Sequence, residues 1–176
     1  MSELTQIALL RGINVGKKNR IKMADLSESL AKVGLENVRT YIQSGNIALE
    51  SKLSRAKLED LIAGAIADDF DCDVPVLVRE KKYFQRVLQE NPFCKSKFDI
   101  AQLHVTLLSK KPSAKAVGEL ADLEFADPYE IAGDVVYLRL VSGYSKTKLT
   151  NGFLEQKLGV AATSRNWETI CKLVEM

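Results

Sequence analysis

The order of apolar patterns along residues 7–78 constrains the fold of this 176-residue chain more than any other feature. Four short apolar runs have strand character, and they lie at residues 7–10, 38–42, 47–50 and 74–78. Between them, residues 23–33 and 54–66 repeat apolar side chains at the spacing of a helix. The resulting order β-α-β-β-α-β predicts an α+β fold of the ferredoxin-like plait type. In that topology the first and third strands are antiparallel neighbours at the centre of the sheet.

Turn and cap residues support these boundaries. Gly45 lies between the second and third runs, where glycine permits the positive φ of a hairpin turn. Gly34 stands at the expected end of the first helix, and Ser54 can cap the second. Pro75 lacks an N–H, which predicts that the run 74–78 is an edge strand.

The second half of the chain repeats this theme less clearly. A helix over 80–90 ends at Asn91-Pro92, because the residue before proline is disfavoured in a helix, and we place the boundary between subdomains 1–91 and 92–176 there. Four further elements are expected: a strand at 103–108, a short helix at 113–120, a hairpin through Gly133-Asp134, and a helix that begins at Thr150 and ends before Gly159. The segment 163–167 is interpreted as the start of the last helix.

Composition excludes several classes of protein. With 46% apolar and 27% charged residues the chain is an ordinary globular protein, and a net charge of +2 is too small for a nucleic-acid coat or a membrane-surface binder. Three widely separated cysteines are interpreted as reduced thiols. The N-terminus has neither a signal peptide nor an apolar run long enough to span a membrane, which predicts a cytoplasmic protein.

Several motifs in a fixed order carry a resemblance to a known family. They lie at residues 8–16, 22–23, 39–46, 145–151 and 163–167. With these motifs the chain resembles the bacterial domain of unknown function 1697 family over essentially its whole length. The resemblance implies two ferredoxin-like subdomains packed together, and it implies no established activity. One departure is Lys17, which stands where a second glycine is expected.

A candidate site follows from the predicted topology. The end of the first strand lies beside the start of the third, which brings polar residues of two segments to one edge: Arg11, Asn14, Lys17, Gln43, Ser44 and Asn46. Residues 4–24 contain five bases and no acid. Because backbone N–H groups and cationic side chains converge well on oxygens, this edge predicts binding of a small ligand through a phosphate or carboxylate, a nucleotide being one such ligand.

Three residues of the second half are further candidates for this site. They are Lys146, Arg165 and Asn166, the last two at a predicted helix N-terminus, where the helix dipole favours an anion. The alternative is a purely structural helix start, with Trp167 as a core anchor and Arg165 in solvent. The spacing of Gly12 and Gly16 excludes a P-loop.

No other pattern predicts chemistry. His104 alternates onto the face opposite Leu103 and Val105, with no partner in the sequence to orient it as a catalyst. The sequence predicts no cofactor and no metal, and it leaves open whether the protein is an enzyme. Two alternative functions remain. Nucleic-acid binding through the sheet is disfavoured because the first and third strands carry no aromatic residue, and an assembly module without a ligand would use the edge strand 74–78, so the oligomeric state stays open.

Overall fold

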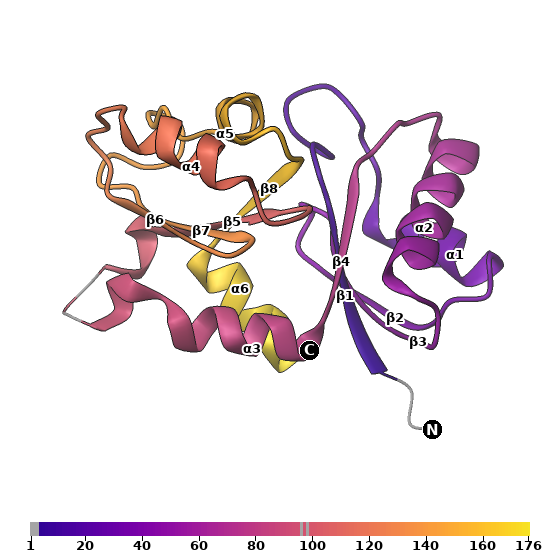
Figure 1. The fold of residues 1–176 in the computed structure, drawn as a ribbon. Helices are drawn as coiled ribbons and strands as arrows, with labels where there is room; N and C mark the ends of the chain where they lie inside the picture. The colour runs from indigo at the N-terminus through magenta and orange to yellow at the C-terminus, as the bar shows by residue number, and fades with distance from the viewer. Residues whose placement is uncertain (1–3, 96, 98) are drawn as a thin grey trace. The chain divides into compact units, whose positions relative to one another are not determined.

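The chain folds into two compact units, each built around its own sheet. The structure, a computed structural model, describes residues 4–95, 97 and 99–176. The first unit runs to Gln85 and includes Leu173–Met176, and the second is Arg86–Lys172. Each contains a four-stranded antiparallel sheet, so the protein belongs to the α+β class, as predicted (Figure 1). The division falls inside one helix, whereas the sequence-based boundary lies at Asn91, where that helix has just ended.

The first unit has the element order that the sequence predicted. Its elements are β1 (Leu4–Leu10), α1 (Met23–Lys32), β2 (Glu36–Tyr41), β3 (Asn46–Ser51), α2 (Arg55–Phe70) and β4 (Val76–Glu80). The strands lie in the order β2-β3-β1-β4, so β1 and β3 are central and antiparallel, with Ala8 opposite Ile47. β4 pairs with β1 alone within the described sheet and is an edge strand, as Pro75 indicated.

The core of the first unit lies between the sheet and its two helices. Alternate residues of β1 and β3 point to this side, among them Ala8, Leu10 and Ile47, all less than 2% exposed. They pack against fully buried leucines and isoleucines of α1 and α2, which lie on the same face of the sheet (Figure 1). The helical spacing read from the sequence therefore corresponds to one buried stripe on each helix.

The second unit repeats the element order of the first. It is entered through α3 (Lys81–Glu90), which straddles the division, and the 3-10 turns η1 (Pro92–Lys95) and η2 (Ile100–Gln102). The remaining elements are β5 (Leu103–Leu108), α4 (Ala114–Ala121), β6 (Tyr129–Ala132), β7 (Val135–Arg139), α5 (Asn151–Leu158), β8 (Ala162–Asn166) and α6 (Trp167–Glu175). The strand order is β6-β7-β5-β8, and α4 and α5 share a core with one face of the sheet.

Strand β8 corrects the sequence-based interpretation. Residues 163–166 were expected to begin the last helix, but they form a strand and the helix starts at Trp167. β8 pairs antiparallel with β5, with Ser164 opposite Thr106 and Arg165 opposite Val105. Its side chains are mostly polar, so it lacks the apolar alternation by which a strand is recognised. The segment is a strand because its main chain pairs with β5, and its own sequence pattern does not indicate one.

The predicted helix caps differ in how they are made. Thr150 caps α5, its Oγ1 accepting a hydrogen bond of 3.3 Å from the N–H of Phe153, and Gly159 ends the helix with φ 67°. Ser54 occupies the N-cap of α2, but its hydroxyl makes no capping hydrogen bond. Among the described residues, no helix combines the length and the apolar character needed to cross a bilayer.

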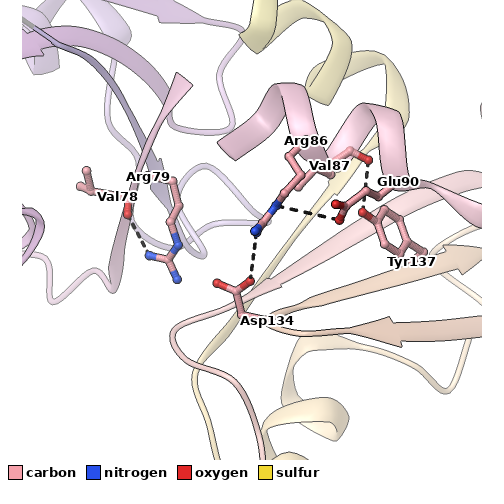
Figure 2. A network of polar contacts seen from close by, with 7 residues as sticks. All are labelled: Val78, Arg79, Arg86, Val87, Glu90, Asp134 and Tyr137. Carbon is pink, nitrogen blue, oxygen red and sulfur yellow. Dashed lines mark hydrogen bonds and ion pairs between the residues drawn. The ribbon is translucent and has the colours of Figure 1, made fainter. Parts of the chain in front are cut away.

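A buried tyrosine ties β7 to the part of α3 that lies in the second unit. The Tyr137 hydroxyl donates to the carbonyl oxygen of Val87 at 3.2 Å (Figure 2). Burial raises the pKa of Tyr137 to about 12, so the phenol remains a donor at neutral pH. Beside it, Arg86 lies 3.9 Å from a carboxylate oxygen of Glu90 and 3.8 Å from one of Asp134.

Candidate functional site

Asn14 holds together the loop that follows β1. Its Nδ2 donates to the carbonyl oxygens of Ile21, at 2.8 Å, and Gln43, at 2.7 Å, and its Oδ1 accepts from the N–H of Ile21 at 2.9 Å. One side chain thus closes the loop and ties it to the β2–β3 turn. We call the loop 11–22 and the turn 42–45 together the rim. The predicted meeting of these two segments is present.

Asn46 points into the protein. It is fully buried, and its Nδ2 donates to the carbonyl oxygen of Tyr41 at 3.0 Å and to Ser44 Oγ at 2.8 Å. The carbonyl oxygen of the neighbouring Gly45 accepts from the N–H of Leu10 at 2.8 Å. These bonds fix the turn against the end of β1. The Asn46 amide therefore acts as a brace for the hairpin.

Gly45 is required at this turn for two reasons. Its φ is 74°, a conformation that side chains other than glycine rarely adopt. A Cβ at this position would lie 2.6 Å from Leu10 Cβ and 2.8 Å from Ile13 Cδ1. Leu10 Cβ is fixed to the backbone and cannot move aside. The glycine is explained by the packing of the rim without any ligand.

A cavity of about 490 Å³ opens beside Asn14. Two of the predicted site residues, Asn14 and Gln43, line it, together with Gly16, Arg20, Ile21, Lys22, Asp25 and Phe70. The other predicted residues of the rim are not among those that line this cavity. Lys17 is exposed, Arg11 is half-buried with its N–H bonded to the carbonyl oxygen of Pro75 at 3.0 Å, and Ser44 bonds Asn46.

The cations that line this cavity are Arg20 and Lys22, which were counted in the acid-free run but not assigned to the site. Arg20 Nη2 donates to the carbonyl oxygen of Gly16 at 3.3 Å. Lys22 is the N-cap of α1 and its side chain makes no capping hydrogen bond, so the start of that helix has no side-chain cap from this residue. Asp25, in the first turn of α1, is the one carboxylate among the described lining residues.

The three predicted site residues of the second unit have separate environments. Lys146 is exposed, and Asn166 Oδ1 accepts from the N–H of Thr169 at 2.9 Å, which caps α6. Arg165 is only 9% exposed, and its Nη1 donates to Thr163 Oγ1 at 3.0 Å and to the Ser164 carbonyl oxygen at 2.8 Å. Burial lowers the pKa of Arg165 to about 10. The expectations that placed Arg165 at a helix N-terminus, or in solvent, are both wrong.

Sequence reasoning missed a polar cluster on the α4–α5 side of the second sheet. His104 stacks on Tyr144 with the ring centroids 5.5 Å apart. Thr106 Oγ1 and Ser164 Oγ are 2.6 Å apart, and Ser164 Oγ donates to Asn151 Oδ1 at 2.7 Å. Burial lowers the pKa of His104, so its imidazole is neutral at pH 7. The cluster depends on the pairing of β5 with β8, which was not predicted.

The edge of β4 is protected by two side chains. Glu59 Oε1 accepts from the N–H of Val78 at 2.8 Å, and Arg79 Nη1 donates to the carbonyl oxygen of the same residue at 2.8 Å (Figure 2). Arg79 Nη1 also lies 3.8 Å from Glu59 Oε1. Both main-chain groups of Val78 are therefore taken, which hinders the addition of another strand at this point.

Comparison with known proteins now places the chain. The family model described as "Protein of unknown function (DUF1697)" matches residues 4–137. The chain belongs to the DUF1697 family. This confirms the resemblance drawn from the sequence motifs. The DUF1697 match includes the whole rim and ends within β7, before the predicted site residues of the second unit.

A solved structure shares the fold of this chain. A conserved bacterial protein from Streptococcus pneumoniae superimposes with a TM-score of 0.76 at 25% sequence identity. The alignment covers 99% of this DUF1697 chain and 98% of the other protein. The search of curated proteins found no match. DUF1697 is described as a family of unknown function, so the comparisons give the family and the fold but no ligand.

Proposed function

We propose that the rim of the first unit binds a small anionic ligand through a phosphate or carboxylate group, as a nucleotide would offer. The observation that carries this proposal is the cavity of about 490 Å³ in which Arg20 and Lys22 flank the Asn14 brace. Its volume lies in the range of small-molecule sites. Two cations against one carboxylate, Asp25, favour an anion there. No reaction is assigned to the site.

The rim residues divide into two roles under this proposal. Asn14 and Asn46 position the loop and the turn, because their amides are bonded to main-chain groups. Arg20 and Lys22, both exposed, contact the ligand, and the uncapped start of α1 adds backbone N–H groups. Within the described part of the chain, no cluster of three or more His, Cys, Asp or Glu side chains is arranged to hold a metal ion. The proposed recognition uses the cationic side chains of Arg20 and Lys22.

We further propose that both units are ferredoxin-like plaits and that the protein works in the cytoplasm. The shared order β-α-β-β-α-β and the central, antiparallel first and third strands of each unit support the first statement. Three free cysteines support the second, because reduced thiols are typical of a reducing compartment.

The structure gives reasons to prefer a small ligand over the two alternatives. Sheet-face RNA binders stack bases on exposed aromatic residues of the first and third strands. Here Ile7 and Leu9 of β1 and Ala48 of β3 are fully buried, and neither strand has an aromatic residue. An assembly module would use the edge of β4, where Glu59 and Arg79 occupy the main-chain groups of Val78.

Thermal unfolding with pyrophosphate, AMP and citrate tests the proposal on the full chain. A ligand that binds only the folded state raises Tm. In the variant Arg20→Ala/Lys22→Ala the ligand should raise Tm less than it does in wild type, because binding at the rim is lost. Lys110→Ala/Lys111→Ala is the matched control, because it removes two exposed cations of the second unit. A flat panel, or an equal loss in both variants, contradicts the proposal, and a band shift with RNA at low salt would favour the nucleic-acid alternative instead.

A further inference from the structure

We propose that the first unit holds a second anion site, at the end of the sheet opposite the rim, which takes an organic phosphate with a small apolar group. The site is a cavity of about 550 Å³ beside the start of α2, and we call it the α2 pocket. The residues that define it include Gln6, Lys52, Arg55, Arg79, Lys82 and Tyr83. They come from β1, the β3–α2 connection, β4 and the first turn of α3.

The α2 pocket is strongly basic. Four cationic side chains line it, against one carboxylate, Glu80. Two of these cations have carboxylate neighbours, because Lys82 Nζ lies 2.6 Å from Glu80 Oε2 and Arg79 Nη1 lies 3.8 Å from Glu59 Oε1, so two positive charges remain in excess. An excess of cations in a partly enclosed cavity attracts an anion and strengthens its hydrogen bonds. The cavity at the rim has a smaller excess of positive charge, because two cations and one carboxylate line it.

The start of α2 adds an uncapped helix end to the pocket. Ser54 is the N-cap residue and lines the cavity, but its hydroxyl makes no capping hydrogen bond. No acidic residue lies in the first turn of this 16-residue helix. The first-turn N–H groups and the positive end of the helix dipole are therefore left for another acceptor. Phosphate is the kind of group that such helix ends bind.

Gln6 is the independent observation that points to a ligand. It lines the pocket and is only 6% exposed. It lies on the face of β1 that Ala8 shares, with Glu80 opposite it on β4. Among the described residues, no group hydrogen-bonds its side-chain amide. Because Gln6 lines the cavity, its amide remains able to donate and accept hydrogen bonds there, and a polar group of a ligand can pair with it.

The apolar residues that line the α2 pocket indicate which group is attached to the phosphate of the ligand. Leu53, 39% exposed, and the ring of Tyr83 line the same cavity. Arg79 lies over that ring, 5.4 Å from its centroid, which holds the ring in place. An apolar or aromatic group of the ligand would lie against these two side chains while its phosphate meets Arg55 and the start of α2. A phosphomonoester with one small ring fits this arrangement.

Calorimetric titration of the full chain with phenyl phosphate, inorganic phosphate and phenol tests the inference. Phenyl phosphate should bind more tightly than inorganic phosphate, and phenol should not bind. Arg55→Gln, at an exposed position, should weaken phenyl phosphate binding about tenfold or more. Gln6→Leu should also weaken it, and Arg55→Gln carries the test if Gln6→Leu does not fold.

The controls separate this site from the rim. Lys110→Ala/Lys111→Ala, which removes two exposed cations of the second unit, should leave the phenyl phosphate affinity unchanged, and Arg20→Ala/Lys22→Ala should remove only binding that belongs to the rim. If phenyl phosphate fails to bind, or if Arg55→Gln binds it as well as wild type does, the inference is overturned. A loss caused by the rim variant alone would overturn the inference and leave the proposed function in place.

Discussion

The two ends of the first sheet use polar residues in opposite ways. At the rim, Asn14 and Asn46 are bonded to the backbone and hold the loop and turn in place. At the α2 pocket, Gln6 is buried without a described hydrogen-bond partner and Ser54 leaves its helix uncapped. The rim carries recognisable sequence motifs, and the α2 pocket has none. Motif residues such as Asn14 and Asn46 can therefore serve the integrity of the fold rather than contact a ligand.

The largest expected effect is at Gly45. Gly45→Ala should lower the free energy of unfolding by about 3 kcal/mol or more, because overpacking against Leu10 adds to the cost of a positive φ. Gly12→Ala is the matched control. Its φ is 73° but nothing lies within 4 Å of its Cβ position, so only about 1–2 kcal/mol is expected. Urea unfolding measures both, and equal losses would show that packing at the rim is not what requires Gly45.

Asn46 and Gln6 should respond with opposite signs. Asn46→Ala removes two hydrogen bonds from a fully buried side chain and should destabilise the protein by about 1–3 kcal/mol. Gln6→Leu replaces an amide that lacks a described partner and should be neutral or stabilising by about 1 kcal/mol. Chemical denaturation without ligand gives both values. If both variants are destabilised by a similar amount, the rim and the α2 pocket do not differ in how their buried amides contribute to stability.

Glu59 tests the edge of β4, which leads into the α2 pocket. Glu59→Ala leaves the N–H of Val78 without its 2.8 Å acceptor, which should cost about 1 kcal/mol and expose the edge to strand addition. Glu59→Gln keeps an acceptor oxygen and is the matched control. In sedimentation velocity the alanine variant should self-associate more than the glutamine variant. Identical sedimentation of the two at all concentrations would contradict this role.

The smallest expected effect extends the comparison to His104 in the second unit. Burial lowers the pKa of folded His104 below its usual value of 6.5, so the unfolded chain binds more protons below that pH. The contribution of His104 to stability is complete above pH 6.5 and is lost as the pH falls toward the folded pKa. Because His104 is the chain's only histidine, His104→Phe should flatten this part of the curve. If the free energy of unfolding changes with pH in the same way in wild type and variant between pH 8 and 5, His104 makes no such contribution.

The sequence predicted the first unit well because its strands and helices carry periodic apolar residues. The apolar runs in β1 and β3, the turn at Gly45 and the edge position of β4 all follow from local patterns and a single topology. β8 was missed because Ser164, Arg165 and Asn166 are polar and the strand exists through its pairing with β5. The burial of Arg165 was missed for the same reason.

The candidate sites were harder to predict than the fold. The meeting of the loop with the β2–β3 turn followed from topology, but the direction of each side chain did not. Asn46 was expected to face a ligand and instead braces the turn. The α2 pocket joins residues far apart in sequence, such as Gln6, Arg55 and Lys82, that share no motif. Only the register of β1 with β4 and the start of α2 brings them together.

Amide chemical-shift mapping of the full chain tests most directly whether the first unit binds anions at both ends. In a titration with phenyl phosphate and then pyrophosphate, we expect one group of shifted amides in residues 54–58, at the start of α2, and another in residues 16–22, at the rim. Arg55→Gln should suppress the first group, and Arg20→Ala/Lys22→Ala the second. Shifts in neither segment, or shifts scattered over exposed lysines and arginines of both units, would contradict the account.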